Sequence, residues 1–291
     1  MTAVGIIVEQ TLLYVPLVVG AYIDIGLMKV PDLALSSAFT FGAITAAKVV
    51  PYCAHLPQPI ALLIVLIAAL AGGTFVGLIS STLTQRAGFS HLLSSIITEG
   101  LFHGINQMVL GSPNMSLSNY KNPLATSLIT GHPELFLLTV IAVTCLVFSY
   151  LLLKTPLGYC FGIYGTNPRF FDHHRISLPF VFGAGVMLSN GLAGLAGYCF
   201  AQSNGFVDIS MGVGIPLFAI TALLLGKIMR PLPALLAGAA GLGLYFVLQQ
   251  ILLRVGFNLN YFMLVQSLLI LVVLLPHQRK KRSAHSSSLG I

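Results

Sequence analysis

Charged residues are scarce in this sequence: Asp, Glu, Lys and Arg make up only 7% of its 291 residues, whereas 56% are apolar. A water-soluble domain keeps roughly a quarter of its residues charged, so this composition excludes an ordinary soluble domain. The mean hydropathy of +0.94 leads to the same conclusion. The chain is therefore expected to be solvated mainly by a lipid bilayer.

Signatures of catalysis and of metal binding are also missing. The four cysteines lie far apart without a C-x-x-C pair, and no G-x-x-x-x-G-K-[ST] phosphate loop occurs. The sequence therefore predicts no metal, no cofactor and no enzymatic activity of its own. The net charge of +7 comes from Lys and Arg residues scattered between apolar runs, so no nucleic-acid partner is expected.

What the sequence does have is a series of long apolar runs. A helix needs about 20 mostly apolar residues to cross the hydrocarbon, because each backbone N–H and C=O there must be paired internally. The runs predict an all-α polytopic membrane protein with about nine transmembrane helices. The candidate spans are 3–22, 33–50, 58–83, 89–110, 134–154, 178–203, 211–229, 232–255 and 259–276.

The basic residues predict how these spans are oriented, because Lys and Arg are retained on the cytoplasmic side. With the basic tail 277–291 inside, nine spans place eleven Lys and Arg residues inside and three outside. The N-terminus then lies outside. An alternative with eight spans treats 23–50 as a re-entrant loop and moves Lys29 away from the cytoplasm.

Sliding the sequence along itself indicates one internal repeat, at an offset of 176 residues. The matched positions are Tyr22 with Tyr198, Asp32 with Asp208, 43–46 with 219–222, and Leu56-Pro57 with Leu232-Pro233. An odd number of spans separates the two copies, so they would be inverted across the membrane. The predicted transmembrane domain, 1–276, consists of repeat 1 at about 3–110, a linking helix at 134–154, the segment 155–177, and repeat 2 at about 178–276.

The segment 155–177 is longer and more mixed in character than the other loops. Pro168 suits the first turn of a helix with Asn167 as its N-cap, so a short cytoplasmic helix is predicted over 165–176. Phe170 and Phe171 are predicted to be exposed on it and to form a docking surface. The alternative is a plain connector whose phenylalanines lie along the lipid interface.

Several stretches between about residues 10 and 275 share the pattern of a known family. They are Thr155, Gly158, Gly165, Asn167 and Pro168; Pro31-Asp32-Leu33; Ile105-Asn106; and Leu188-Ser189-Asn190-Gly191-Leu192 with Gln202 and Asp208. These stretches resemble the permeases of branched-chain amino acid and ribose type importers, most closely those named for tryptophan and tyrosine. Residues 171–176 depart from the family pattern, which usually has small residues there.

The resemblance implies a type II permease fold and the permease subunit of an ATP-binding cassette (ABC) importer for a small polar solute, such as an amino acid. It also implies a cytoplasmic ABC ATPase, an extracytoplasmic solute-binding protein and a homodimer, in a bacterial cytoplasmic (inner) membrane. In such families the loop after the linking helix is seated in the ATPase. This role would fall on Gly165, Asn167, Pro168, Phe170 and Phe171.

Polar side chains within the apolar runs are candidates for lining the solute path. Asp32 and Asp208 each open an apolar stretch, where a carboxylate can either cap a helix or border the path. Asn190 is either a contact between helices or part of the pore wall, in a span whose glycines permit close helix packing.

Glu99, His103 and Asn106 have the spacing of one helix face and also suit a path. The predicted path consists of Asp32, Ser36, Glu99, His103, Asn106, Asn190, Gln202 and Asp208. An ion-coupled secondary transporter is the main alternative function, because inverted repeats with polar groups near the midplane are typical of that class too. A third hypothesis, an intramembrane enzyme, is supported only by Glu99 and His103.

Overall fold

The structure, a computed structural model, describes residues 3–53, 55–120, 124, 133–229, 232–258 and 261–272. Nearly all regular structure in these residues is helical, which confirms the all-α prediction. Two short strands, β1 (Asn114–Ser116) and β2 (Phe206–Asp208), form an antiparallel pair in which Asn114 lies opposite Asp208. The basic tail 277–291 lies outside the described residues.

Each predicted apolar run contains one helix. The helices are α1 (Ala3–Ala21), α2 (Leu35–Val49), α3 (Gln58–Ala87), α4 (His91–Leu110), α5 (Pro133–Leu153), α8 (Leu178–Asn204), α9 (Ile215–Ile228), α10 (Ala234–Arg254) and Phe262–Val272. Within the described residues, five helices are long and apolar enough to cross a membrane: α1 with its extension to Leu27, α3, α5, α8 and α10. Both α9 and Phe262–Val272 are apolar but shorter.

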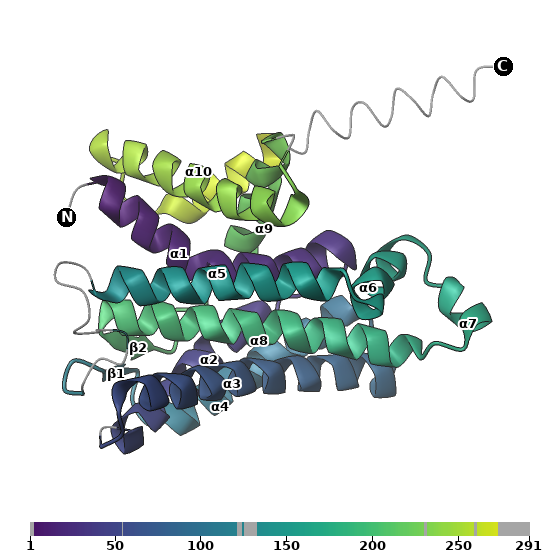
Figure 1. The fold of residues 1–291 in the computed structure, drawn as a ribbon, viewed down its shortest axis with the longest axis horizontal. Helices are drawn as coiled ribbons and strands as arrows, with labels where there is room; N and C mark the ends of the chain where they lie inside the picture. Colours follow the sequence, from purple (N-terminus) through teal and green to yellow (C-terminus); the bar gives the residue numbers. More distant parts are fainter. Residues whose placement is uncertain are drawn as a thin grey trace.

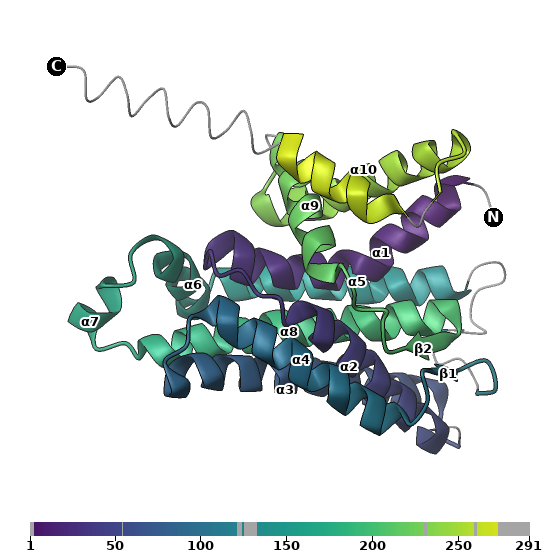
Figure 2. The same ribbon diagram turned by 180° about the vertical axis from the view of Figure 1, so that it is seen from behind.

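The long helices lie side by side and give the molecule two distinct ends (Figure 1). The strands β1 and β2 lie at the end where α1 begins, whereas the short helix α7 (Phe170–His174) projects at the opposite end. Seen from behind, α2 and α4 cover the face formed by α3 and α8 (Figure 2). Helices α9 and α10 form a further layer beside α1.

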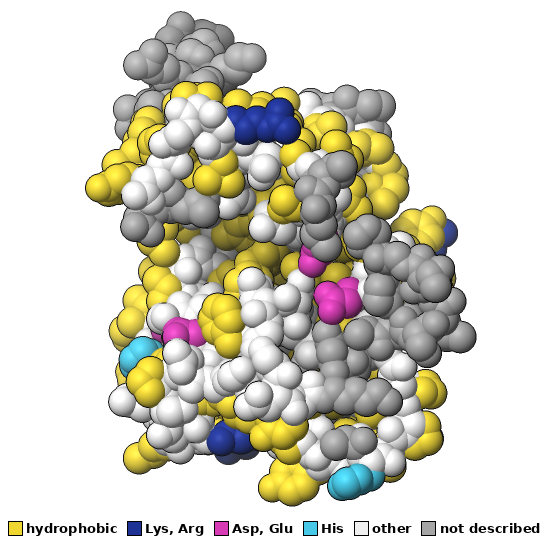
Figure 3. All heavy atoms as spheres, turned by 90° about the vertical axis from the view of Figure 1, so that its left-hand side faces the viewer, with side chains coloured by type: hydrophobic (Ala, Val, Ile, Leu, Met, Phe, Trp, Pro, Cys, Tyr) yellow, Lys and Arg dark blue, Asp and Glu magenta, His cyan; other side chains and the backbone are white. Residues whose placement is uncertain are grey.

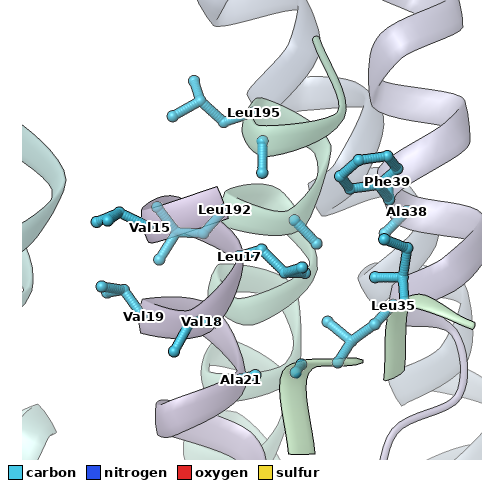
Figure 4. Packing of buried hydrophobic residues seen from close by; sticks show 14 of the residues in the cluster. Val15, Leu17, Val18, Val19, Ala21, Leu35, Ala38, Phe39, Leu192 and Leu195 are labelled. Atoms are coloured by element: carbon cyan, nitrogen blue, oxygen red, sulfur yellow. The ribbon is translucent and has the colours of Figure 1, made fainter. Parts of the chain in front are cut away.

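Helix α8 is the centre of the bundle and packs against α1, α2 and α3. Its glycines allow this close approach, as the sequence predicts. A Cβ atom added at Gly42 would lie 2.3 Å from the Cα of Gly194, and one added at Gly197 would lie 1.9 Å from the carbonyl oxygen of Phe39. Figure 4 shows side chains from α1, α2 and α8, including Phe39, meeting in this core.

The segment 155–177 is more helical than the sequence predicts. Thr155 opens an additional helix, α6 (Pro156–Thr166), and its hydroxyl accepts a hydrogen bond from the backbone N–H of Gly158. Asn167 ends α6, so the prediction that it is the N-cap of a helix over 165–176 is wrong. Proline at the first turn is a common helix start, and Pro156 provides that signal one helix earlier than Pro168.

The two phenylalanines of this segment differ in exposure. Phe171 is only 1% exposed because its ring packs between Tyr164 and Phe170, with ring centroids 6.4 and 5.9 Å away. The prediction that Phe171 is exposed is therefore wrong. Phe170 is half-buried and stacks on the ring of His174 at a centroid distance of 3.9 Å.

Candidate functional site

Two aspartates are buried where α1, α2 and α8 meet. Asp24 is 0% exposed and accepts a hydrogen bond from the hydroxyl of Ser189 at 2.7 Å. Asp32 is 1% exposed and accepts one from the side-chain amide of Asn190, also at 2.7 Å. Because Ser189 and Asn190 are consecutive residues of α8, this one helix holds both carboxylates.

Asp32 has two further partners. Its Oδ1 accepts a hydrogen bond from the backbone N–H of Ala34 at 2.9 Å, in the turn before α2. The N-cap of α2 is Ala34, without a side-chain cap, so the prediction that Asp32 caps a helix is wrong. The same oxygen lies 3.6 Å from Nε2 of His91, the first residue of α4. The Asp32 carboxylate thus joins α2 to α4 and α8.

Asp24 and His91 are not among the residues predicted from the sequence. Asp24 lies in η1 (Tyr22–Leu27), a π-helical turn that extends α1. Such turns are frequent at functional sites but have no hydrophobic period of their own. The available signal was the carboxylate itself, because an acidic residue inside an apolar run needs a polar partner.

A second polar group lines a groove between α2 and α4. The Ser36 hydroxyl donates a hydrogen bond to Oε1 of Glu99 at 2.6 Å, and the Ser37 hydroxyl donates one to the backbone carbonyl of Glu99 at 3.3 Å. With His103 and Asn106 these residues line a cavity of about 40 Å³. The prediction that Glu99, His103 and Asn106 share a helix face is confirmed. This volume suffices for a water molecule or a small polar group.

The groove contains one unpaired acceptor. Asn106 is 2% exposed, and within the described residues its Oδ1 has no hydrogen-bond partner. Leaving such an atom unpaired costs about 1–3 kcal/mol, so a ligand donor placed there would be favoured. The adjoining surface of α4 is open, because a Cβ atom added at Gly100 or Gly104 would meet nothing within 4 Å.

Gln202 and Asp208 lie near the two strands and are not among the described residues that line the groove. Gln202 is buried near the end of α8. Asp208 ends β2 and accepts hydrogen bonds from the backbone N–H of Ser210, at 2.7 Å, and from its hydroxyl. The prediction that Asp208 caps a helix is wrong, because the N-cap of α9 is Gly214.

The segment between α5 and α8 touches the π-helical turn directly. A Cβ atom added at Gly165 would lie 2.0 Å from the carbonyl oxygen of Leu27, so α6 presses against η1. Asn167 and Pro168 are exposed beyond the end of α6. A displacement of α6 would therefore reach the turn that carries Asp24.

Comparison with known proteins decides the family. The model of a family described as the permease component of branched-chain amino acid transport systems matches residues 4–274. The chain belongs to this permease family. The permease is therefore a multi-pass membrane component of a bacterial ABC importer, without a catalytic role of its own. Permeases of this family generally work with an ATPase and a binding protein.

Similar proteins support this assignment. The permease is 28% identical to the tyrosine transport system permease protein of Clostridioides difficile over 78% of its own length and 73% of the relative's. It is 28% identical to an uncharacterised protein of Rickettsia prowazekii over 86% and 89% of the two chains. It is also 29% identical to the autoinducer 2 import system permease protein LsrC of Escherichia coli, over 74% and 62%. No solved protein structure matches the permease.

Proposed function

We propose that this permease forms the path for a small polar solute, an amino acid or a related compound. The groove between α2 and α4 carries this proposal, because Ser36, Glu99 and Asn106 meet there and line a cavity. Ionisable groups at membrane depth normally face protein or water rather than lipid. The tyrosine transport system permease among the relatives supports an amino acid as the solute.

The remaining predicted path residues fit this groove in two ways. Asp32 and Asn190 hold α2 against α8 beside it, only one helical turn before Ser36. Gln202 and Asp208 lie toward the strands, at the end where the path would open.

The inverted repeat fits the arrangement of the helices. The paired prolines Pro57 and Pro233 are the N-caps of the long helices α3 and α10, with nearly equal φ and ψ of −55° and 139° against −51° and 138°. The paired aspartates Asp32 and Asp208 precede α2 and α9. Repeats of this kind let one half rock against the other while the solute site stays near the midplane. Nine spans, with the N-terminus outside, would place α7 on the cytoplasmic side.

Each of the three proposed partners would occupy a different surface of the permease: one of its two ends, or the open face of α4. The ATPase would dock on the segment 155–177, through Gly165, Asn167, Pro168, Phe170 and Phe171. The solute-binding protein would meet the end with β1 and β2. A second copy of the chain would cover the open α4 surface at Gly100 and Gly104, since small residues are common where membrane helices meet. The assembly would lie in the bacterial cytoplasmic (inner) membrane.

An ion-coupled secondary transporter is the second candidate. The buried pair of Asp24 and Asp32 favours it, because carboxylates at membrane depth are typical of ion and proton pathways. The projecting segment α6–α7 favours the importer, since a secondary transporter needs no docking surface for an ATPase.

Co-purification tests the proposal. The tagged permease, extracted from its native membranes in a mild detergent, is expected to bring along one ABC ATPase and, with solute present, one solute-binding protein, identified by mass spectrometry. A permease that purifies alone, in the same detergent that keeps another importer of the cell intact, would contradict it.

A further inference from the structure

A second cavity lies beside the groove, between α1, α9, α10 and Phe262–Val272. Its volume is about 560 Å³, within the roughly 300–1,000 Å³ of small-molecule sites. Val213 lines both this cavity and the groove, so the segment before α9 separates them. The lining includes the start of α1 and the end of α8, which places the cavity at the end of the molecule with β1 and β2. Figure 3 looks onto this end and shows it hollowed, with acidic side chains near its middle.

Aromatic rings form one wall of the cavity. The ring of Tyr14 lies 4.7 Å from that of Phe218 and 5.7 Å from that of Phe200, centroid to centroid. Tyr245 lies 4.7 Å from Phe218 on the other side. All four rings line the cavity. Rings held in mutual contact offer a pre-formed surface for another aromatic group.

Two glutamine side chains that line the cavity have amide oxygens without a hydrogen-bond partner in the described part of the chain. Gln266 is 7% exposed; its side chain donates to the hydroxyl of Tyr245, and its Oε1 has no partner within the described residues. Oε1 of Gln249 is buried and without a partner there as well. Even if the Gln266 amide were turned over, one of its two polar atoms would stay unpaired. Buried polar atoms in native structures are nearly always satisfied, so the cavity is built for a polar ligand.

The charged residues that line the cavity indicate the charge of the ligand. The carboxylate of Glu9, which accepts a hydrogen bond from Ser203 at 2.8 Å, lines the cavity, and no Lys, Arg or His is among the described lining residues. An ammonium group is therefore favoured near Glu9.

We propose that this cavity binds an aromatic α-amino acid. Its ammonium group lies between Glu9 and Gln249, and its ring lies on the wall formed by Tyr14 and Phe218. None of these residues belongs to the path predicted from the sequence. The inference rests on the proposed function only in taking the ligand to be the transported solute.

Equilibrium binding of radiolabelled L-tyrosine to the purified permease, without its partners, tests this assignment. L-Tyrosine and tyramine, which both carry an amine, are expected to bind more tightly than 3-(4-hydroxyphenyl)propionate, which lacks it. L-Leucine is expected to compete poorly because it has no ring.

Matched variants locate the site. Gln249→Leu is expected to weaken L-tyrosine binding about tenfold, the effect of losing one hydrogen bond to a charged group. Gln250→Leu is the control, because Gln250 follows on the same helix but does not line the cavity. Glu9→Gln removes the carboxylate charge beside the ligand amine, so it is expected to reduce the preference for tyramine over 3-(4-hydroxyphenyl)propionate. This variant replaces Gln249→Leu as the test if Gln249→Leu does not fold.

Equal binding by the Gln249→Leu and Gln250→Leu variants, equal competition by tyramine and 3-(4-hydroxyphenyl)propionate, or no binding at all would overturn the inference. Uptake of L-tyrosine by cells separates this failure from that of the proposed function. If Gln249→Leu leaves the uptake of L-tyrosine unchanged, the cavity is not the binding site of the solute, and the proposed importer function still stands. Binding that persists in a permease that transports nothing would refute the proposed function alone.

Discussion

The side-chain amide of Asn190 donates a 2.7 Å hydrogen bond to the carboxylate of Asp32, which lies 158 residues earlier in the chain. Both side chains are buried, so this bond joins the middle of α8 to the start of α2 out of contact with water. The contact between helices, one of the two roles that the sequence left open for Asn190, is therefore present.

Asn190→Ala is expected to lower the free energy of unfolding by about 1–3 kcal/mol, because it leaves a buried carboxylate without its amide donor. Asn106→Ala is the matched variant, since Oδ1 of Asn106 has no partner to lose within the described chain. It should reduce solute uptake while changing stability less. Thermal unfolding in detergent, together with uptake by cells, measures both effects. Equal destabilisation by the two variants would contradict this division of roles.

Gly197→Ala is expected to destabilise the permease by about 1–3 kcal/mol, because its Cβ atom would lie 1.9 Å from the carbonyl oxygen of Phe39 and α8 would have to move. Gly243→Ala is the control, since a Cβ atom at Gly243 in α10 meets nothing within 4 Å. The control should be neutral or slightly stabilising. Denaturant unfolding in detergent compares the two, and similar losses would show that the packing of α8 is not the cause.

Phe171→Ser is expected to loosen the segment 155–177, because it removes a buried ring and places a hydroxyl in its site. Phe170→Ser should leave the segment folded and reduce transport-linked ATP hydrolysis. Limited trypsin digestion at Arg169 and Arg175 measures the first effect, and ATPase activity of the assembled complex measures the second. Equal cleavage of both variants would contradict the difference in burial.

Ser118→Cys and Thr166→Cys are expected to react with a membrane-impermeant thiol reagent from opposite sides, because these exposed residues lie at opposite ends of the bundle. Ser118 should react from outside the cell and Thr166 only after the membrane is opened. Cys160→Ser removes the half-buried native thiol as background. Labelling of both positions from one side would refute the proposed orientation.

The helices could be predicted from the sequence because each consists of a long apolar run, as in α3 and α8. The π-helical turn Tyr22–Leu27 could not, since it continues α1 without any break in the apolar pattern. Helix α6 could not be predicted from an apolar run because its residues are mixed in character, although Thr155-Pro156 is a typical helix start. Phe171 was misjudged because its burial depends on Tyr164, which is seven residues away and lies in another helix.

Which polar residues lie together was predictable only where the partners share one helix. Glu99, His103 and Asn106 follow one another at helical spacing, and they do lie together. Asp24 and Ser189 are separated by 165 residues, so only the packing of α1 against α8 brings them together. Two further inward-facing amides, Gln249 and Gln266, come from different helices and likewise gave no pattern.

We propose that the permease carries an amino acid across the membrane with energy from a separate ATPase. Uptake of radiolabelled L-tyrosine into proteoliposomes that contain the permease, its ATPase and its solute-binding protein tests it most directly. Uptake is expected with ATP on the ATPase side, and no uptake is expected with ATP when the ATPase is omitted. Uptake by the permease alone, driven by a sodium or proton gradient, would contradict it.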